Sequence, residues 1–536
     1  MYKKLSNFIL AFSIGLVFVN CANRGTPEGG PKDLDPPVIV KAIPENYSTQ
    51  FSDNEIKIYF DEYVKMKDLQ KQLIISPPMD TPPEITPIGS ASKYITIKIH
   101  DTLEANTTYA FNFGNSIVDN NEGNPYPYYR YVLSTGDYID SLTVKGQVVD
   151  AIKRQPETFI NVALYEVDST FSDSIVYKEK PKYITNTLDS LTTFSIENIK
   201  AGKYMLMALK DGNGDNKFQQ KTDQIAFYKD FIEVPTDSLY TLKLFSEDLD
   251  FNASRPILDA SEKITFGYEG DYRGMTIDIN SEVPDNFSYR ITKDEKTDSL
   301  YYWYKPKLEV DSLLFTVSNS KNKFKKDYTV KIRDKKRDSL TLKGILPTGS
   351  EDPYKIRGSV PFMSFDDSKI SIMDKDSLNV DFSTEFDTIN NTYAINFKRT
   401  EENSYKIQVL PEAFTDFFET KNDTLNYSVT TKEKSDSNLR IYLKNAVYPV
   451  IVQLTDKDGK VKLEQYVTKN KPVDFFHIQP GKYYLRVVFD SNGNKKYDTG
   501  NYLKKIQPER VSFYQGQPDD DIRAGWDAVW TFILLN

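Results

Sequence analysis

The sequence predicts an all-β protein built as tandem β-sandwich domains. Apolar and polar residues alternate in short runs such as 56–60 (IKIYF), 94–99 (YITIKI) and 393–397 (YAINF), which is the period of a strand with one buried face. Clusters of Gly, Pro, Asn and Asp separate these runs roughly every 10 residues, a spacing typical of antiparallel sandwiches. The 36 Tyr and 32 Phe residues bring the aromatic content to 13%, which favours sheets.

The first segment of the chain predicts export and lipid attachment. Lys3 and Lys4 precede an apolar run at residues 8–19. At about 1.5 Å per residue this run spans about 18 Å of helix, too little to cross a bilayer core of about 30 Å. The run is instead typical of the apolar core of a signal peptide, which we assign to residues 1–20. Cys21 follows as the sole cysteine, and we expect it to carry a lipid; an incidental cysteine after an ordinary signal peptide is the alternative.

A flexible tether is expected after this cysteine. Residues 21–37 are rich in Gly and Pro and have little apolar surface to bury. Such a composition does not support a packed domain.

Two internal repeats divide the rest of the chain. Residues 199–218 and 478–497 share nine identical positions in a turn, a strand and an Asp-x-Asn-Gly loop. A weaker match joins 106–119 with 403–416. The simplest explanation is that each of two sandwich types occurs twice.

The repeated segments resemble known modules. Residues 35–137, with DPPV at 35–38 and NTTY at 106–109, resemble the bacterial Ig-like domain of surface-layer proteins. Residues 140–250 and 436–515 resemble the transthyretin-like, carboxypeptidase-regulatory sandwich. The position of Cys21 resembles a lipobox, and the segment from Cys21 to Asp33 resembles the start of Ig-like-domain lipoproteins of Bacteroidota. The expected layout is an Ig-like domain at 38–138, a transthyretin-like domain at 139–252, a β-rich domain of unknown type at 253–348, a second Ig-like domain at 349–435, a second transthyretin-like domain at 436–515 and an aromatic C-terminal segment at 516–536.

Composition argues against several classes of function. Lys and Arg total 68 against 77 Asp and Glu, and no basic stripe stands out, so no nucleic-acid partner is expected. Two His and one Cys leave little material for zinc sites, Cys–His pairs or Ser–His–Asp triads. A carboxylate-based hydrolase would need an acid pair, and none is singled out, so we assign no catalytic residue and expect no enzyme.

The repeated acidic loop predicts a calcium site, with an ordinary hairpin loop as the alternative. Oxygen ligands at alternating positions suit Ca²⁺ because a tight loop turns them inward. Without calcium the same composition would form Asx turns. The expected ligands are Asp490, Asn492, Asn494, Lys496 (through its carbonyl) and Asp498 in the second copy, and Asp211, Asn213 and Asp215 in the first.

The C-terminal segment holds two of the three tryptophans and is apolar on both faces of the expected strand. A strand buried on both faces needs cover on both sides. Either the strand folds back into its own sandwich, or Trp526, Trp530 and Phe532 dock to a partner.

Taken together, these features and resemblances imply a non-enzymatic outer-membrane lipoprotein. We expect a rod or arc of sandwiches, anchored through Cys21 and facing the cell surface. It would act as a scaffold or accessory subunit of an outer-membrane β-barrel complex for barrel assembly, secretion or uptake. The alternative is a surface protein for adhesion or for binding glycans or peptides.

Overall fold

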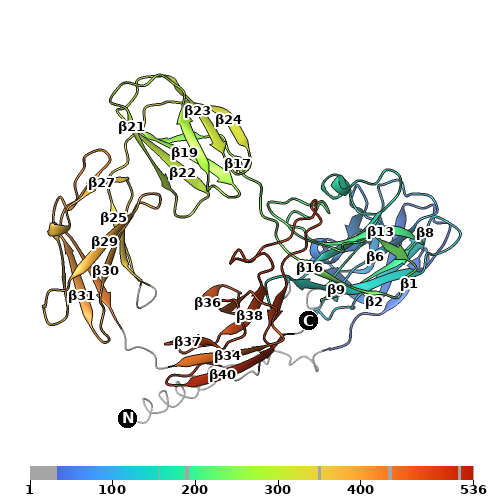
Figure 1. The fold of residues 1–536 in the computed structure, drawn as a ribbon. Coiled ribbons are helices and arrows are strands. Elements are labelled where there is room, and N and C mark those ends of the chain that lie inside the picture. Colours follow the sequence, from blue (N-terminus) through green and yellow to red (C-terminus); the bar gives the residue numbers. More distant parts are fainter. Residues whose placement is uncertain are drawn as a thin grey trace, which may run out of the picture.

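The computed structural model describes residues 33–155, 157–187, 192–347, 352–431, 437–516 and 521–534. The described residues form five β-sandwiches in chain order, so the predicted all-β tandem architecture is confirmed (Figure 1). The predicted signal peptide and Cys21 lie outside these residues, and lipid attachment stays a prediction. Among the residues described, no helix has both the length and the apolar character needed to cross a bilayer.

The first sandwich follows the alternating pattern of its sequence. In β2 (Glu55–Met66), Ile56, Ile58 and Phe60 are buried in the core while the residues between them are more exposed. One sheet runs β1 (Ile39–Ile43), β2, β5 (Ser92–Lys98) and β4 (Glu84–Thr86), with β7 (Ile117–Asp119) also paired to β2; the other runs β3 (Ile74–Ser76), β6 (Thr108–Asn112) and β8 (Arg130–Ser134), and the short helix α2 (Leu69–Gln72) precedes β3.

The second sandwich packs a three-stranded sheet against a larger sheet, and its last strand, β16, runs parallel to its first, β9. The smaller sheet runs β12 (Thr193–Ile199), β9 (Leu142–Asp150) and β16 (Leu239–Leu244); the larger runs β11 (Tyr183–Asn186), β10 (Asn161–Glu166), β13 (Gly202–Lys210) and β14 (Gln224–Phe227), with β15 (Ile232–Val234) paired to β13 and the 3-10 helix η1 (Asp173–Tyr177) after β10.

The third segment, which the sequence left without a fold type, is also a sandwich. Its core contains Phe266, Tyr302 and Phe315, whose rings pack edge to face. One sheet runs β17 (Asn252–Ala253), β19 (Lys263–Glu269), β22 (Ser299–Lys305) and β21 (Ser288–Lys293), with β18 (Ile257–Ala260) paired to β19; the other runs β20 (Met275–Ile279), β23 (Ser312–Asn319) and β24 (Phe324–Lys331).

The fourth sandwich repeats the strand paths of the first. Tyr109 and Tyr405 each accept a hydrogen bond at the phenol oxygen from a backbone N–H five residues earlier, at 2.9 and 2.7 Å. One sheet runs β25 (Leu342–Ile345), β26 (Tyr354–Gly358), β30 (Thr392–Phe397) and β29 (Phe382–Asp387); a second runs β28 (Ile370–Met373), β31 (Ser404–Val409) and β33 (Leu425–Thr430); β27 (Phe362–Phe365) pairs with β32 (Phe414–Asp416), and η2 (Asp367–Lys369) precedes β28. Because β25 pairs with β26, this sandwich begins before the expected boundary at residue 349.

The fifth sandwich repeats the strand paths of the second. Its last strand, β40, runs parallel to its first, β34, as β16 does to β9. The aromatic C-terminal segment is therefore the closing strand of this sandwich and not a separate unit. One sheet runs β37 (Val473–Phe475), β34 (Asn438–Lys444) and β40 (Asp527–Ile533); the other runs β36 (Val461–Val467), β35 (Val450–Thr455), β38 (Tyr484–Phe489) and β39 (Val511–Phe513).

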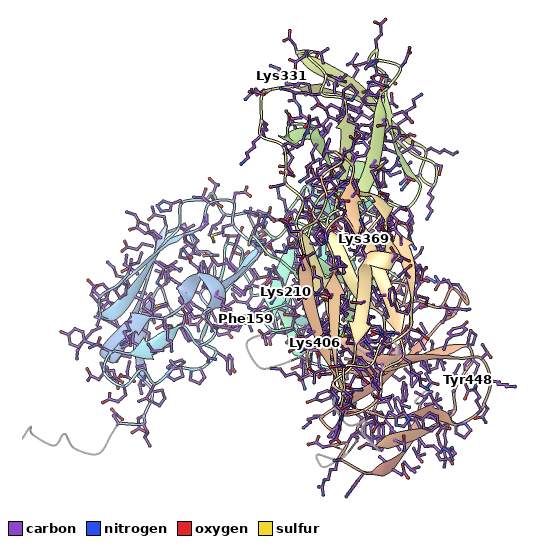
Figure 2. All side chains as sticks on the ribbon, turned by 90° about the vertical axis from the view of Figure 1, so that its left-hand side faces the viewer. Phe159, Lys210, Lys331, Lys369, Lys406 and Tyr448 are labelled. Carbon is purple, nitrogen blue, oxygen red and sulfur yellow. The ribbon has the colours of Figure 1, made fainter. Side chains whose placement is uncertain are left out.

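A rod or arc of sandwiches was expected. The second to fifth sandwiches form a closed arrangement, which we call the ring (Figure 1). Buried Trp303 of the third sandwich contacts Val360 and Phe417 of the fourth. The fifth sandwich returns to the second through contacts described below. The first sandwich lies outside this closed arrangement and packs on the second (Figure 2). At their contact, Lys71 Nζ lies 4.2 Å from the centroid of the phenyl group of Phe159.

Candidate functional site

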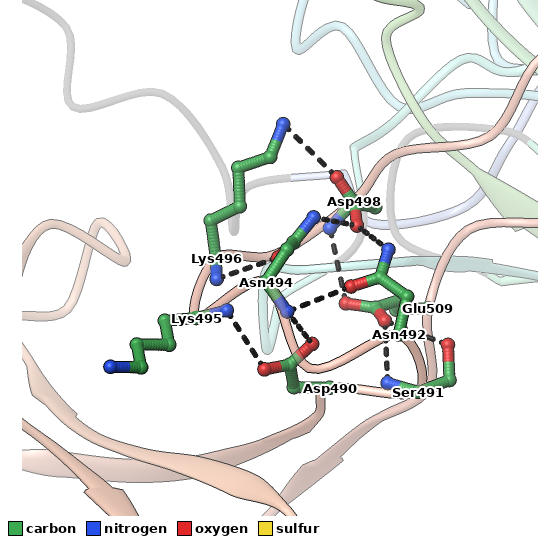
Figure 3. A network of polar contacts seen from close by, with 8 residues as sticks. All are labelled: Asp490, Ser491, Asn492, Asn494, Lys495, Lys496, Asp498 and Glu509. Carbon is green, nitrogen blue, oxygen red and sulfur yellow. Dashed lines mark hydrogen bonds and ion pairs between the residues drawn. The ribbon is translucent and has the colours of Figure 1, made fainter.

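The C-terminal Asp-x-Asn-Gly loop forms a network of hydrogen bonds centred on two carboxylates (Figure 3). Asp490 follows β38 directly and is only 1% exposed. Its oxygens accept the backbone N–H groups of Asn494 at 3.1 Å and Lys495 at 2.9 Å. At the other end of the loop, Asp498 Oδ2 accepts the side-chain amides of Asn492 at 2.5 Å and Asn494 at 2.6 Å. The loop therefore satisfies its own carboxylates.

Lys496 and Glu509 complete this network. Lys496 Nζ lies 3.1 Å from the second oxygen of Asp498. Burial alone would raise the pKa of Asp498, but the hydrogen bonds from Asn492 and Lys496 hold it below its usual value. Glu509 accepts the N–H and hydroxyl of Ser491, both at 2.8 Å, and the N–H of Asp498 at 3.1 Å. Glu509 could not be recognised from the sequence, because only the fold brings the residues before β39 to this loop.

The first copy of the loop is built in the same way. Asp211 accepts the N–H groups of Gly214 and Asn216, both at 2.7 Å. Asp215 accepts the side-chain amides of Gln219 at 2.9 Å and Asn213 at 3.3 Å. Both copies thus have the Asx-turn geometry of the hairpin alternative. Within the described ranges, no group of three or more His, Cys, Asp or Glu side chains is placed to hold a metal ion.

Calcium binding by these loops stays a prediction. A calcium ion in the C-terminal loop would have to replace the amide donors that now satisfy Asp498. Extracellular calcium modules bind with dissociation constants of about 10⁻⁴–10⁻³ M. Titration calorimetry of the chelator-treated chain is therefore expected to record heat as Ca²⁺ reaches millimolar concentration, and Asp498→Ala to remove the part of this heat that comes from the C-terminal loop. Wild-type protein that gives no heat in this range would contradict the prediction.

Asp490 has a structural role that does not depend on calcium. Replacing it with alanine leaves the N–H groups of Asn494 and Lys495 without their acceptor. We expect Asp490→Ala to lower the free energy of unfolding by about 1–3 kcal/mol, measured by urea unfolding in the presence of a chelator. Asp458→Ala, at an exposed position in another turn of the same sandwich, is the matched control. Equal stability of the two variants would show that the carboxylate is dispensable.

The loop leads into residues 499–507, the docking segment, which joins the fifth sandwich to the second. Tyr502 is 0% exposed and belongs to a core cluster of the second sandwich. Its ring packs edge to face on Phe227 with a centroid separation of 5.4 Å, and its hydroxyl lies 3.0 Å from the sulfur of Met205. The backbone N–H of Tyr502 donates to the buried carboxylate of Glu247. A side chain of the fifth sandwich therefore completes a second hydrophobic cluster of the second sandwich, on the face of its larger sheet opposite to the core between the sheets.

Polar contacts surround this aromatic anchor. Thr499 donates its hydroxyl to the carbonyl of Ser246 at 2.6 Å, and Gln507 donates to that of Phe227 at 2.9 Å. Lys505 Nζ pairs with Asp173 at 2.6 Å. This interface was not predicted from the sequence, where its one local signal is a tyrosine within a stretch rich in Gly, Asn and Lys.

Glu247 should make docking depend on pH. Burial raises the pKa of its carboxyl, and the N–H of Tyr502 offsets this only in part. A carboxyl whose pKa is higher in the folded state than in the unfolded state stabilises the fold when it is protonated. For a glutamate this stabilisation is complete below the unfolded pKa of about 4.3, and it is lost as the pH rises through the folded pKa. Glu247→Gln keeps the oxygen acceptor. We therefore expect this variant to be more stable than wild type at neutral pH and equal to it in acid, as measured by thermal unfolding across pH.

The control for Glu247 is Glu233→Gln, at an exposed position of the same sandwich. If both variants follow the wild-type pH profile, Glu247 does not influence docking.

The C-terminal aromatic residues divide between core and surface, which corrects part of the docking prediction. Trp530 is 5% exposed, stacks on Tyr514 at a centroid separation of 5.3 Å, and packs in the fifth core with Phe532. These two side chains are not available to a partner, because β40 turns them toward the opposite sheet. Trp526 is 50% exposed beside Arg523, and partner docking through it stays a prediction. The expectation that β40 is covered on both faces is also wrong, since Val529 lies on an exposed outer face.

Comparisons with known proteins agree with the fold. Residues 33–135 match the family model described as a bacterial Ig-like domain, which confirms the resemblance noted for the first sandwich. No curated protein matches the chain.

Several solved structures are similar at low identity. One is surface layer protein SbsC, domains 1–6, with 11% identity over 90% of this chain and 67% of that chain and a TM-score of 0.15. Another is a Bacteroides ovatus mixed-linkage glucan utilization locus SGBP-B in complex with a mixed-linkage heptasaccharide, with 11% identity over 62% and 87% and a TM-score of 0.18. A third is the Bacillus anthracis TIE protein, with 11% identity over 95% and 75% and a TM-score of 0.15.

Proposed function

We propose that this chain is a non-enzymatic scaffold of the outer membrane, an accessory subunit of a β-barrel complex for barrel assembly, secretion or uptake. It is held at the cell surface by a lipid on Cys21. The observation that carries this proposal is the docking of the fifth sandwich on the second through Tyr502. A string of sandwiches joined only by linkers would hold nothing in a fixed place, whereas a ring presents its surfaces at fixed positions.

Interfaces at two junctions of the ring, between the third and fourth sandwiches and between the fifth and second, support a fixed arrangement. Trp303 is buried between the third and fourth sandwiches, and Arg357 of the fourth pairs with Glu295 of the third at 2.8 Å. Tyr502 plays the equivalent part between the fifth and second. Inter-domain contacts that are small and polar permit motion, and buried aromatic anchors restrict it.

The surface best suited to a partner lies on the outer face of the sheet that contains β40. Val529 and Ile533 are exposed there, and Tyr442 of the neighbouring strand lies on the same face. Trp526, the residue before β40, is exposed as well. Exposed aromatic and aliphatic side chains at one place are typical of protein interfaces. In this proposal Trp526 contacts the membrane complex, while Trp530 packs in the core and stabilises the strand.

Affinity purification of the full chain from detergent-solubilised native membranes, followed by cross-linking mass spectrometry, tests the proposal. We expect outer-membrane β-barrel proteins to co-purify, with cross-links near β40. Trp526→Ala should weaken their recovery. Tyr47→Ala, which removes an exposed tyrosine of the first sandwich, should not. Purification of the chain with no membrane partner would refute the scaffold role.

A further inference from the structure

A cleft of about 620 Å³ lies between the first and second sandwiches. One wall is the outer face of the sheet β3-β6-β8, and the other is the outer face of the sheet β12-β9-β16. The edge strand β11 lies against β3 at its floor, where the N–H of Ile184 donates to the hydroxyl of Ser76 at 3.1 Å. The size is within the range of about 300–1,000 Å³ typical of ligand sites.

Contacts between the sandwiches hold the two walls in place. Arg130 of β8 forms an ion pair with Glu197 of β12, and its second terminal nitrogen donates to Asn198 Oδ1 at 2.7 Å. Lys182 pairs with Glu104 at 2.5 Å. Because these contacts join the two sandwiches directly, the cleft exists before any ligand arrives, and binding does not require the walls to be ordered first.

The lining combines aliphatic surface and neutral hydrogen-bonding groups with the paired Arg130 and Glu197 and the exposed ammonium of Lys145. Gln147 donates to Thr241 Oγ1 at 3.1 Å along one wall, and Ser195 donates to Glu197 at 3.1 Å. Tyr128, on the other wall, is 44% exposed. The apolar part of the lining is contributed by Ile74, Ala110, Ile184 and Leu239, and further amides and hydroxyls come from Asn112, Asn186, Thr185 and Thr193.

We propose that this cleft binds a neutral oligosaccharide. A pyranose chain presents C–H faces and hydroxyls in alternation, and each hydroxyl can both donate and accept. The amides and hydroxyls of the walls offer both functions, the paired Arg130 and Glu197 offer a donor and an acceptor without net charge, and the ring of Tyr128 offers an apolar face with a polar end. This role is independent of the scaffold role proposed above.

The orientation of the walls favours a glycan over an extended peptide. A peptide that adds to a sheet needs an open row of backbone N–H and C=O groups at a strand edge. Both walls here are sheet faces that present side chains, and the edge of β3 lies against β11. Recognition by side-chain amides and hydroxyls is what a ligand rich in hydroxyl groups requires.

A glycan array followed by titration calorimetry on the full chain tests the proposal, with cellohexaose, maltohexaose, xylohexaose and mannohexaose as the soluble probes. We expect at least one neutral glycan to bind. Gln147→Ala and Tyr128→Ala should each weaken that binding about five- to tenfold, as expected for the loss of one hydrogen bond or one ring contact. Tyr94→Ala, at an exposed tyrosine on the opposite sheet of the first sandwich, should bind like wild type.

Thermal unfolding checks that each variant is folded. The proposal is overturned if no array glycan binds, if binding is equal in the cleft variants and in Tyr94→Ala, or if a peptide library occupies the cleft instead. Co-purification of the β-barrel complex by Gln147→Ala should equal that by wild type. Failure of the glycan proposal therefore leaves the scaffold proposal standing, and the reverse also holds.

Discussion

Replacing Tyr502 with alanine is expected to separate the fifth sandwich from the second and so open the closed arrangement of sandwiches. Tyr502 is the fully buried anchor by which the fifth sandwich packs into the outer hydrophobic cluster of the second. Removal of a buried aromatic side chain costs about 3–5 kcal/mol through lost burial and the cavity left behind. Here that loss falls on the docking interface and on the core beneath it. Small-angle scattering should record a larger radius of gyration for Tyr502→Ala, and urea unfolding should record an earlier transition for the second sandwich.

Two other variants serve as controls for Tyr502→Ala. Tyr502→Phe keeps the aromatic group that packs on Phe227 and loses only the hydroxyl, so the fifth sandwich should stay docked on the second. Tyr442→Ala removes an exposed tyrosine from the fifth sandwich and should change neither measurement. A radius of gyration for Tyr502→Ala equal to that of Tyr442→Ala would mean that the docking segment does not hold the ring.

Replacing Trp530 with alanine is expected to unfold the fifth sandwich. The indole fills the space between the two sheets, stacked on Tyr514 with 16° between the rings. The expected loss is about 3–5 kcal/mol, a large part of the stability of about 5–15 kcal/mol that a domain possesses. The docking segment belongs to the same sandwich, so the ring should open as a consequence. Far-ultraviolet circular dichroism and urea unfolding measure the effect.

Trp526→Ala is the matched control, because it removes the same kind of side chain from an exposed position four residues before the buried Trp530 of β40. It should leave the unfolding transition unchanged while weakening partner recovery. If the two tryptophan variants unfold alike, the division of the segment into a core residue and a surface residue is incorrect.

The strand pattern and the repeats could be predicted from the sequence because both depend on local order. Burial alternates along β2 with the period that its sequence displays. The shared loop at Asp211 and Asp490 indicated two copies of one sandwich, and the strands follow matching paths in both. The Asx turns around those aspartates are also local, since each carboxylate accepts N–H groups a few residues further along the chain.

The contacts between sandwiches could not be predicted, because they join residues far apart in the chain. Tyr502 meets Glu247 across 255 positions, and nothing around either residue indicates the other. The cleft walls come from two domains whose relative placement is set by contacts such as that of Arg130 with Glu197. The C-terminal strand was misjudged for a related reason. Its apolar residues point to both faces, and only the fold determines that Trp530 faces the core and Val529 faces outward.

The ring is tested most directly by a distance measured between the second and fifth sandwiches. Spin labels at Asp230→Cys and Asp458→Cys, both exposed positions, can be placed after Cys21→Ser removes the native thiol. Pulsed electron spin resonance should give one narrow distance population, and adding Tyr502→Ala should convert it to a longer and broader one. A broad or longer population in the chain with native Tyr502 would contradict the closed arrangement and, with it, the scaffold that depends on it.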